Sequence, residues 1–141
     1  MRKGFATEDT EITERRDKCG MADELTERII GAAMEVHKAL GPGLLEAIYE
    51  EALCYEFELR GIHYERQVPA DISYKGRIIK GQRLDVLVEK GVVVEVKSIA
   101  KTPDVVVSQT ISYLKAMNLK RGLIINFGES RLIDGVKRVS V

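Results

Sequence analysis

The sequence predicts an α/β domain of the mixed, α+β kind, in which helices pack against a mixed central β-sheet. Two segments with helical spacing of apolar residues come first, and the apolar period changes to that of strands at Ile62. A third helical segment then lies between two strand-like runs, which predicts a parallel, right-handed crossover. These features together favour helices packed on a sheet that contains both parallel and antiparallel neighbours.

Residues 1–22 are polar, mixed in charge and without periodicity, so we expect a mobile tail followed by a single domain over 23–141. The first predicted helix spans 23–40, with Asp23 as its N-cap. Gly41-Pro42-Gly43 ends it and begins a second helix over 44–60. The core stripe expected on this second helix is Leu45, Ile48, Ala52, Leu53 and Leu59.

The remaining elements are mostly strands. Residues 62–74 indicate a strand, and Pro69 places part of it at an edge or bulge. Tyr74-Lys75-Gly76-Arg77 predicts a turn. The later predicted elements are strands over 78–88 and 92–99, a helix over 104–117, a buried strand over 121–127 and a short edge strand over 132–139.

Composition bounds the class of protein. A chain of 141 residues with 45% hydrophobic and 31% charged residues is typical of one globular domain. No apolar run is long enough to span a membrane, and no signal peptide is visible. Cys19 and Cys54 have neither metal-site spacing nor a disulfide pattern. We therefore expect a cytoplasmic protein that does not associate with membranes.

The net charge is zero, but the charges are unevenly distributed. Residues 1–59 contain 7 Lys and Arg against 14 Asp and Glu, and residues 60–141 contain 15 against 8. The first segment therefore carries −7 and the second +7. A basic segment of this kind favours a surface that faces a polyanion.

The stretch 83–98 predicts a hairpin around a Glu89-Lys90-Gly91 loop, with Gly91 in the left-handed conformation. This loop pairs residues so that Asp85 lies opposite Glu95. Because side chains alternate between faces, one face is entirely apolar. Its members are Leu84, Val86, Val88, Val92, Val94 and Val96. The other face carries Arg83, Asp85, Leu87, Val93, Glu95 and Lys97.

Two interpretations of this charged face remain open from the pattern alone. Two carboxylates with Cβ atoms about 5 Å apart suit a divalent metal with oxygen ligands, most simply Mg²⁺, and leave Lys97 free to act on a substrate oxygen. Alternatively, the face is closed by two salt bridges, Asp85–Lys97 and Arg83–Glu95, because buried charges need partners.

Four residues on the predicted helices are further candidates. Glu46 lies in the first turn of the second helix, where the helix dipole alone explains a carboxylate, but it is also able to face the metal site. His37 adjoins the core stripe of the first helix and is either a hydrogen-bonded core residue or a metal ligand. Gln109 and Tyr113 are one helical turn apart and share one face of the third helix. They are either a polar pair on the helix surface or residues that contact a phosphate or a base of a nucleic acid.

The hairpin resembles the D…(D/E)xK core of the PD-(D/E)xK nuclease superfamily, with Asp85 followed ten residues later by Glu95-Val96-Lys97. Gly43-Leu44-Leu45-Glu46-Ala47-Ile48-Tyr49 resembles the pattern that names the GxxExxY protein family. The segments VHKALGPGLLE, RLDVLVE, QTISYLK and LIINF are also similar to that family. The resemblance extends over roughly 25–139.

The resemblance implies a restriction-endonuclease-like fold, which is a mixed central sheet flanked by helices. It implies that Asp85, Glu95 and the main-chain carbonyl of Val96 bind Mg²⁺, with Mn²⁺ as a possible substitute. Lys97 would orient or help to deprotonate the attacking water. In the superfamily a glutamate on an early helix often completes the metal site, which corresponds to Glu46.

Gln109 and Tyr113 match the QxxxY element of the exonuclease-like branch, which implies contacts to nucleic acid. A helix histidine binds metal in part of that branch, which makes His37 a candidate ligand. Leu84 stands where the superfamily name has proline, a common departure.

The expected function is metal-dependent hydrolysis of phosphodiester bonds in DNA or RNA. The alternative is a catalytically silent module with the nuclease fold that binds nucleic acid or protein. A third possibility is a nuclease that is active only as a homodimer or within a larger complex. The intact D…ExK core with Glu46 favours the first, because a binding module does not need that cluster.

Overall fold

A computed structural model describes the backbone of residues 11–141 and the side chains of residues 24–141. In chain order the elements are α1 (Glu11–Leu40), α2 (Glu46–Leu59), β1 (Tyr64–Pro69), β2 (Ile72–Tyr74), β3 (Arg77–Ile79), β4 (Arg83–Val88), β5 (Val92–Lys97), α3 (Asp104–Met117), β6 (Arg121–Asn126), the 3-10 turn η1 (Leu132–Gly135) and β7 (Val136–Ser140).

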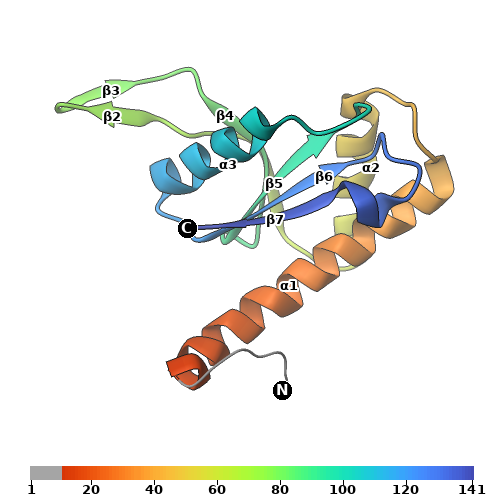
Figure 1. The fold of residues 1–141 in the computed structure, drawn as a ribbon, viewed down its shortest axis with the longest axis horizontal. Helices are drawn as coiled ribbons and strands as arrows, with labels where there is room; N and C mark the ends of the chain where they lie inside the picture. The colour runs from red at the N-terminus through yellow and green to blue at the C-terminus, as the bar shows by residue number, and fades with distance from the viewer. Residues whose placement is uncertain (1–10) are drawn as a thin grey trace.

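Five strands form one mixed sheet in the order β1-β4-β5-β6-β7 (Figure 1). β5 and β6 are parallel, and the other neighbouring pairs are antiparallel. Helix α3 connects the two parallel strands, so the predicted crossover and the mixed sheet are confirmed. Pro69 lies at the end of the edge strand β1, where its missing N–H costs no ladder hydrogen bond.

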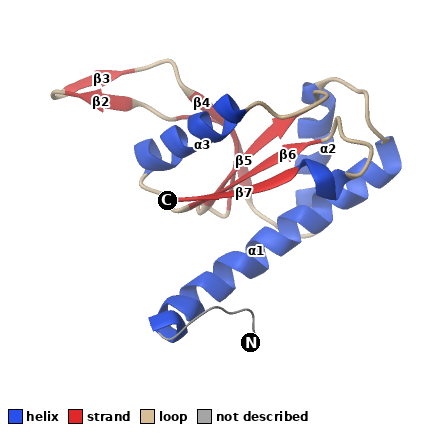
Figure 2. Ribbon diagram, viewed as in Figure 1, coloured by secondary structure: helices blue, strands red, loops and turns tan. Residues whose placement is uncertain are grey.

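Helices flank the sheet on both faces (Figure 2). The larger apolar cluster joins α1 and α2 to one face, with Ile29, Leu53, Phe57, Val94 and Leu123 among its buried members. The smaller cluster joins α3 to the other face, through Val106 and Leu114 against Val93 and Ile124. A sheet covered on both faces explains why β5 and β6 are continuously apolar.

Helix α1 begins at Glu11 and not at the expected Asp23. Residues 11–22, which we expected in a polar tail, are therefore helical, and their part of α1 extends beyond the sheet (Figure 1). Once the segment around Ile29 and Ala33 is packed, adding further turns avoids the cost of a new nucleus. Residues 1–10 of the expected tail lie outside the described residues.

The predicted core stripe of α2 was only partly correct: Leu53 is buried and Ala52 packs against the core, but the other three members are exposed. Tyr49, Leu53 and Phe57 are fully buried and form the stripe that faces the sheet. Large aromatic side chains bury more surface than the aliphatic side chains beside them, so they set the rotation of the helix. Tyr49 also stacks on Phe127, with ring centroids 4.5 Å apart. The expected core residues that are exposed instead are Leu45, Ile48 and Leu59.

The hairpin of β4 and β5 has the predicted register, with Val86, Leu87 and Val88 opposite Val94, Val93 and Val92. The turn differs from the prediction, because Glu89 and Lys90 have positive φ (51° and 56°) and Gly91 does not. Two successive left-handed residues suit the twist of a hairpin. The residue that precedes β1 supports them, since Glu89 donates its N–H to the carbonyl of His63 at 2.9 Å.

The predicted strand 62–74 is in fact two strands. β1 ends at Pro69, and β2 pairs only with β3 in a separate two-stranded sheet around the predicted turn at Lys75 and Gly76. We refer to residues 71–80 as the arm. It projects from the main sheet beside α3 (Figure 1).

Candidate active site

Asp85 and Glu95 lie where the β4–β5 ladder ends. Val86 and Val94 are the last residues that pair through their backbones. Beyond them, carboxylate oxygens accept the N–H groups that backbone carbonyls would otherwise accept. The N–H of Asp85 donates to Oε2 of Glu95 at 3.0 Å, and the N–H of Val96 donates to Oδ2 of Asp85 at 2.9 Å. Each carboxylate is therefore bound to the strand that carries the other. This arrangement confirms that the two residues face each other across the hairpin.

The backbone of β4 is irregular at this point. Asp85 is the residue of β4 that does not pair with β1, where Gln67 has a φ of 54°. Left-handed conformations cost a residue other than glycine about 1–2 kcal/mol. Leu84 also departs from the predicted alternation, because it packs with Leu87 and Val93 on the α3 face of the sheet. Backbone pairing between β4 and β5 thus stops before Asp85, and the two carboxylates bond the strands there instead.

Burial raises the pKa of both carboxyl groups. Glu95 is 4% exposed, and burial followed by the nearby Asp85 charge raises the pKa of Glu95 to about 8. The pKa of Asp85 is raised mainly by burial as well, although the N–H of Val96 opposes the shift. The positive charge of the half-buried Lys97 lowers the pKa of both groups without cancelling the effect of burial.

The salt-bridged alternative is not formed. In the part of the chain that the structure describes, neither Asp85 nor Glu95 has an ion pair within 4.0 Å. Arg83, the other expected partner, donates from Nη1 to the carbonyl of Gln67 at 2.9 Å. Two buried carboxylates without a directly paired cation are unfavourable, unless a further cation binds between them.

The oxygen atoms at this point suit a hard divalent cation. Oδ1 of Asp85 and Oε1 of Glu95 accept no hydrogen bond within residues 24–141. Because the N–H and C=O of one strand residue point to the same neighbouring strand, the Val96 carbonyl also faces Asp85. Two carboxylates and a carbonyl are ligands that Mg²⁺ accepts, with water completing its shell. The residues present therefore fit the implied metal.

No larger ligand cluster is present in that region. Among the described residues, no three His, Cys, Asp or Glu side chains are placed to hold a metal together. A cation at Asp85 and Glu95 would accordingly take its remaining ligands from the main chain, water and substrate.

Glu46 is the first residue of α2 and is exposed. It lies close enough to Asp85 for its negative charge to contribute to the raised pKa of that carboxyl. This electrostatic contact places Glu46 on the side of the molecule that carries the carboxylate pair. A direct role as a ligand remains a prediction.

The turn before α2 explains the spacing of glycine, glutamate and tyrosine in this segment. The hydroxyl of Tyr49 donates to the carbonyl of Gly41 and accepts the N–H of Leu44 at 3.1 Å. Gly43 has a φ of 105°, which other residues rarely adopt. Ser98, directly after Lys97, donates its hydroxyl to the Leu44 carbonyl at 2.5 Å. These bonds join the start of α2 to the end of β5.

Glu50 belongs to the same acidic group and was missed by the sequence reasoning. It lies one helical turn after Glu46, is 8% exposed, and its charge raises the pKa of both site carboxyls. Nε of Arg66 is 3.0 Å from its Oε2, and the amide of Gln67 donates to it at 3.1 Å. The i, i+4 spacing from Glu46 was the available signal.

Asn126 is a second residue that was missed. It is fully buried at the end of β6, opposite Lys97 in the register. Its Oδ1 accepts the N–H groups of Ile99 and Gly128, both at 3.0 Å, and its Nδ2 donates to the carbonyl of Ile99 at 3.0 Å. A polar residue that ends an apolar strand was the only signal. Asn126 fixes the chain that follows Lys97.

Helix α3 approaches the carboxylates from the other face of the sheet. Tyr113 is half-buried, and its pKa is raised. The main cause is burial, followed by the negative charges of Glu95 and Asp85. Gln109 is exposed one turn earlier on the same helix. Tyr113 thus lies within electrostatic range of both carboxylates, and contact of either side chain with nucleic acid remains a prediction.

His37 has a structural environment. It is 8% exposed, and its Nε2 lies 2.9 Å from the carbonyl of Glu129. Its ring is tilted against Phe127 at 6.2 Å between centroids. These contacts match the alternative of a hydrogen-bonded core histidine, and they occupy Nε2, one of its two ring nitrogens.

Comparison with known proteins identifies the family. A model of the PD-(D/E)XK nuclease superfamily matches residues 23–139, which is most of the chain. No curated protein and no solved structure matches the sequence. Within the described residues, the structure contains no helix that is both long and apolar enough to cross a membrane. The mixed sheet flanked by helices is the expected restriction-endonuclease-like architecture, while the finer GxxExxY assignment stays a prediction. The chain belongs to the PD-(D/E)XK nuclease superfamily.

Proposed function

We propose that this protein is a metal-dependent nuclease that hydrolyses phosphodiester bonds in DNA or RNA. One observation carries the proposal: Asp85 and Glu95 are held side by side at the open end of the hairpin, without an ion pair among the described residues. Membership of the nuclease superfamily supports this function. A pair of buried carboxylates kept without a partner is more consistent with a cation site than with a stabilising element.

The residues that would hold the metal are Asp85, Glu95 and the main chain at Val96, with Glu46 contributing through water, or directly once its exposed side chain turns toward the cation. The metal would be Mg²⁺, or Mn²⁺ in its place, because all of these ligands offer oxygen. When bound, a divalent cation lowers the pKa of its water and neutralises charge on the scissile phosphate. We propose that His37 serves the core and is not a ligand, given its bond to Glu129.

The chain's own residues complete the chemistry. Lys97 lies at the end of β5, on the same face as the carboxylates, and would orient the attacking water and its proton. Tyr113 and Gln109 would contact the substrate from α3. Part of the basic segment 60–141 would contact the phosphate backbone, so binding should weaken as salt is added. The free, buried thiol of Cys54 is consistent with a cytoplasmic location.

The test compares the wild type with Asp85→Ala and Lys97→Ala on single-stranded, duplex and structured DNA and RNA, with Mg²⁺ or Mn²⁺. Each substitution should reduce cleavage at least ~100-fold, the usual effect of removing a positioned acid–base or charge-stabilising group. Lys101→Ala is the matched control, because Lys101 is an exposed lysine four residues after Lys97.

Metal binding should be measured separately by calorimetry. Asp85→Ala should abolish it and Lys97→Ala should retain it, since an ammonium group is not a ligand. A wild type that binds no metal and cleaves nothing beyond what the variants cleave would refute the proposal. Binding of nucleic acid without metal binding or cleavage would establish the silent binding module instead.

A further inference from the structure

The arm is exposed from Ile72 to Lys80. All residues of β2 and β3 are exposed, although Ile72, Tyr74, Ile78 and Ile79 are large and apolar. A two-stranded hairpin is marginally stable on its own. This one is secured at its base, where Ala70 and Gln82 exchange hydrogen bonds of 2.8 and 3.2 Å. The arm is thus held in place while its surface is left uncovered.

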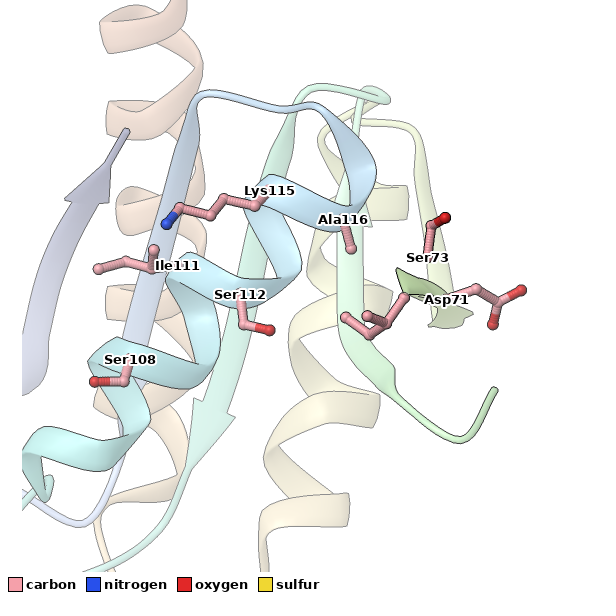
Figure 3. A pocket seen from close by; sticks show the side chains of 8 residues that line it. Asp71, Ser73, Ser108, Ile111, Ser112, Lys115 and Ala116 are labelled. Carbon is pink, nitrogen blue, oxygen red and sulfur yellow. The ribbon is translucent and has the colours of Figure 1, made fainter. Parts of the chain in front are cut away.

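A groove of about 500 Å³ separates the arm from α3. Its lining includes Ser108, Ser112 and Lys115 on the helix and Asp71 and Ser73 on the arm. Figure 3 shows α3 beside the arm, with Ser112 on the side of the helix nearer to it. Hydroxyl and ammonium groups are the side chains that usually contact phosphate oxygens. A volume of this order accommodates a small-molecule-sized ligand, such as an unpaired nucleotide, and not a base-paired helix.

One face of the arm is suited to contact bases. The register places Tyr74 opposite Arg77, so both side chains lie on the same face. Tyr74 is 60% exposed, and Nζ of Lys75 lies 5.4 Å from the centre of its ring. In the described part of the chain Arg77 has neither a hydrogen bond nor an ion pair from its side chain. Exposed aromatic rings and guanidinium planes are surfaces on which unpaired bases stack.

The groove leads toward the carboxylate pair. Ser112 donates its hydroxyl to Oε1 of Gln82 at 3.4 Å. Gln82 precedes Asp85 by three residues, which is about 10 Å along an extended strand. Tyr113, whose pKa responds to the carboxylates, directly follows Ser112 on α3. A strand that lies in the groove therefore has a short path to the site.

We propose that the groove and the arm bind an unpaired nucleic-acid strand and guide it to Asp85 and Glu95. Ser108, Ser112 and Lys115 contact its phosphates, and Tyr74 and Arg77 stack on its bases. The proposal rests on the proposed function for the identity of the ligand as nucleic acid.

Charge favours this occupant over a second copy of the chain. The arm carries three cationic residues, Lys75, Arg77 and Lys80, against the single carboxylate of Asp71. Lys80 is paired with that carboxylate at 3.2 Å, so the free charge of the arm is positive. Two arms placed together would repel each other, whereas a phosphate backbone would be attracted.

The test measures binding of labelled oligo-dT and oligo-U by fluorescence anisotropy in EDTA, so that no cleavage occurs. Tyr74→Ala should weaken binding roughly tenfold through the loss of one stacked base, and Tyr74→Phe should restore it. Lys115→Gln should reduce the slope of log K against log salt by about 0.7, the value for one phosphate contact on a single strand.

Lys137→Gln is the matched control, because Lys137 is an exposed lysine on β7, at the other edge of the sheet. It should leave both the affinity and the slope unchanged. Equal losses in Lys115→Gln and Lys137→Gln, or a higher affinity for duplex than for unpaired strands, would overturn the proposal. A wild-type dimer that Tyr74→Ala dissociates without change in oligonucleotide affinity would assign the arm to a second copy.

The two proposals fail in different ways. A wild type that binds unpaired strands through the arm but cleaves none contradicts the nuclease function and supports the strand path. A wild type whose cleavage requires Asp85, and whose Tyr74→Ala variant binds and cleaves normally, contradicts only the strand path.

Discussion

Replacing Glu95 with glutamine should stabilise the metal-free protein at alkaline pH. Burial and the Asp85 charge raise the pKa of Glu95 from 4.5 to about 8. Between these two pH values the folded protein holds a proton that the unfolded chain releases, so the free energy of unfolding falls as the pH rises. At about 1.4 kcal/mol per pH unit, the full loss is on the order of 5 kcal/mol.

Glutamine removes the charge and keeps an oxygen that accepts the N–H of Asp85, now bonded at 3.0 Å. In Glu95→Gln the decline with pH should therefore largely disappear. The two proteins should have similar stability at pH 5, and the variant should be more stable by several kcal/mol at pH 8.

The assay is urea denaturation in EDTA from pH 5 to pH 8, repeated with Mg²⁺ or Mn²⁺. A cation that binds only the folded state adds about 2.7 kcal/mol at a concentration 100-fold above its Kd. The wild type should regain this stability at pH 8, and Glu95→Gln should gain little. Glu65→Gln is the matched control, because Glu65 is exposed on the edge strand β1.

Two results would refute this reasoning. The first is a wild type in EDTA whose stability follows that of Glu95→Gln at every pH. The second is equal stabilisation of both proteins by the cation, which would place the metal elsewhere.

Three further predictions concern residues around the site. Tyr49→Phe should lower the free energy of unfolding by about 1–3 kcal/mol, measured by denaturant titration, because the Leu44 N–H and the Gly41 carbonyl lose their hydrogen-bond partner. An unchanged titration midpoint would contradict this explanation of the tyrosine in the motif. Asn126→Ala should lower the free energy of unfolding by roughly 2–5 kcal/mol, since it leaves several buried backbone groups without a hydrogen-bond partner. Cleavage should also fall, because the chain after Lys97 is no longer held in place. A variant of normal stability would contradict this role. Burial raises the pKa of Cys54 to about 12, so its thiol should react with alkylating reagents only as fast as the protein unfolds. Rapid labelling of the native protein at this cysteine would contradict its buried position.

The hairpin illustrates which part of the fold was predictable. Alternation along 86–88 and 92–97 specified both the faces and the register, because a slip by one residue would expose every core valine, whereas Leu84 departs from it. The parallel crossover followed from a helical segment between two apolar runs. The rotation of α2 was not predictable in the same way, since two apolar stripes compete on that helix and only packing against Phe127 favours Tyr49.

The candidate site shows the same division. Asp85, Glu95 and Lys97 were predicted together because they share one face of a local hairpin. Glu46 and Tyr113 come from helices on opposite sides of the sheet, and the resemblance to the nuclease family was needed to associate them with the hairpin. Glu50 was missed despite its i, i+4 spacing from Glu46, because an acidic residue on a helix normally faces solvent, and here Arg66 and Gln67 hold it inside.

The sequence by itself determined most of the elements, the hairpin register and the placement of two carboxylates and a lysine on one face. These properties depend on neighbours within one strand or one turn, where backbone geometry leaves little choice. Tertiary structure decided that the ladder ends at Asp85, that Glu50 joins the site, and that residues 71–80 leave the sheet as an arm. These features arise from contacts between segments distant in the chain, whose energies no local pattern contains.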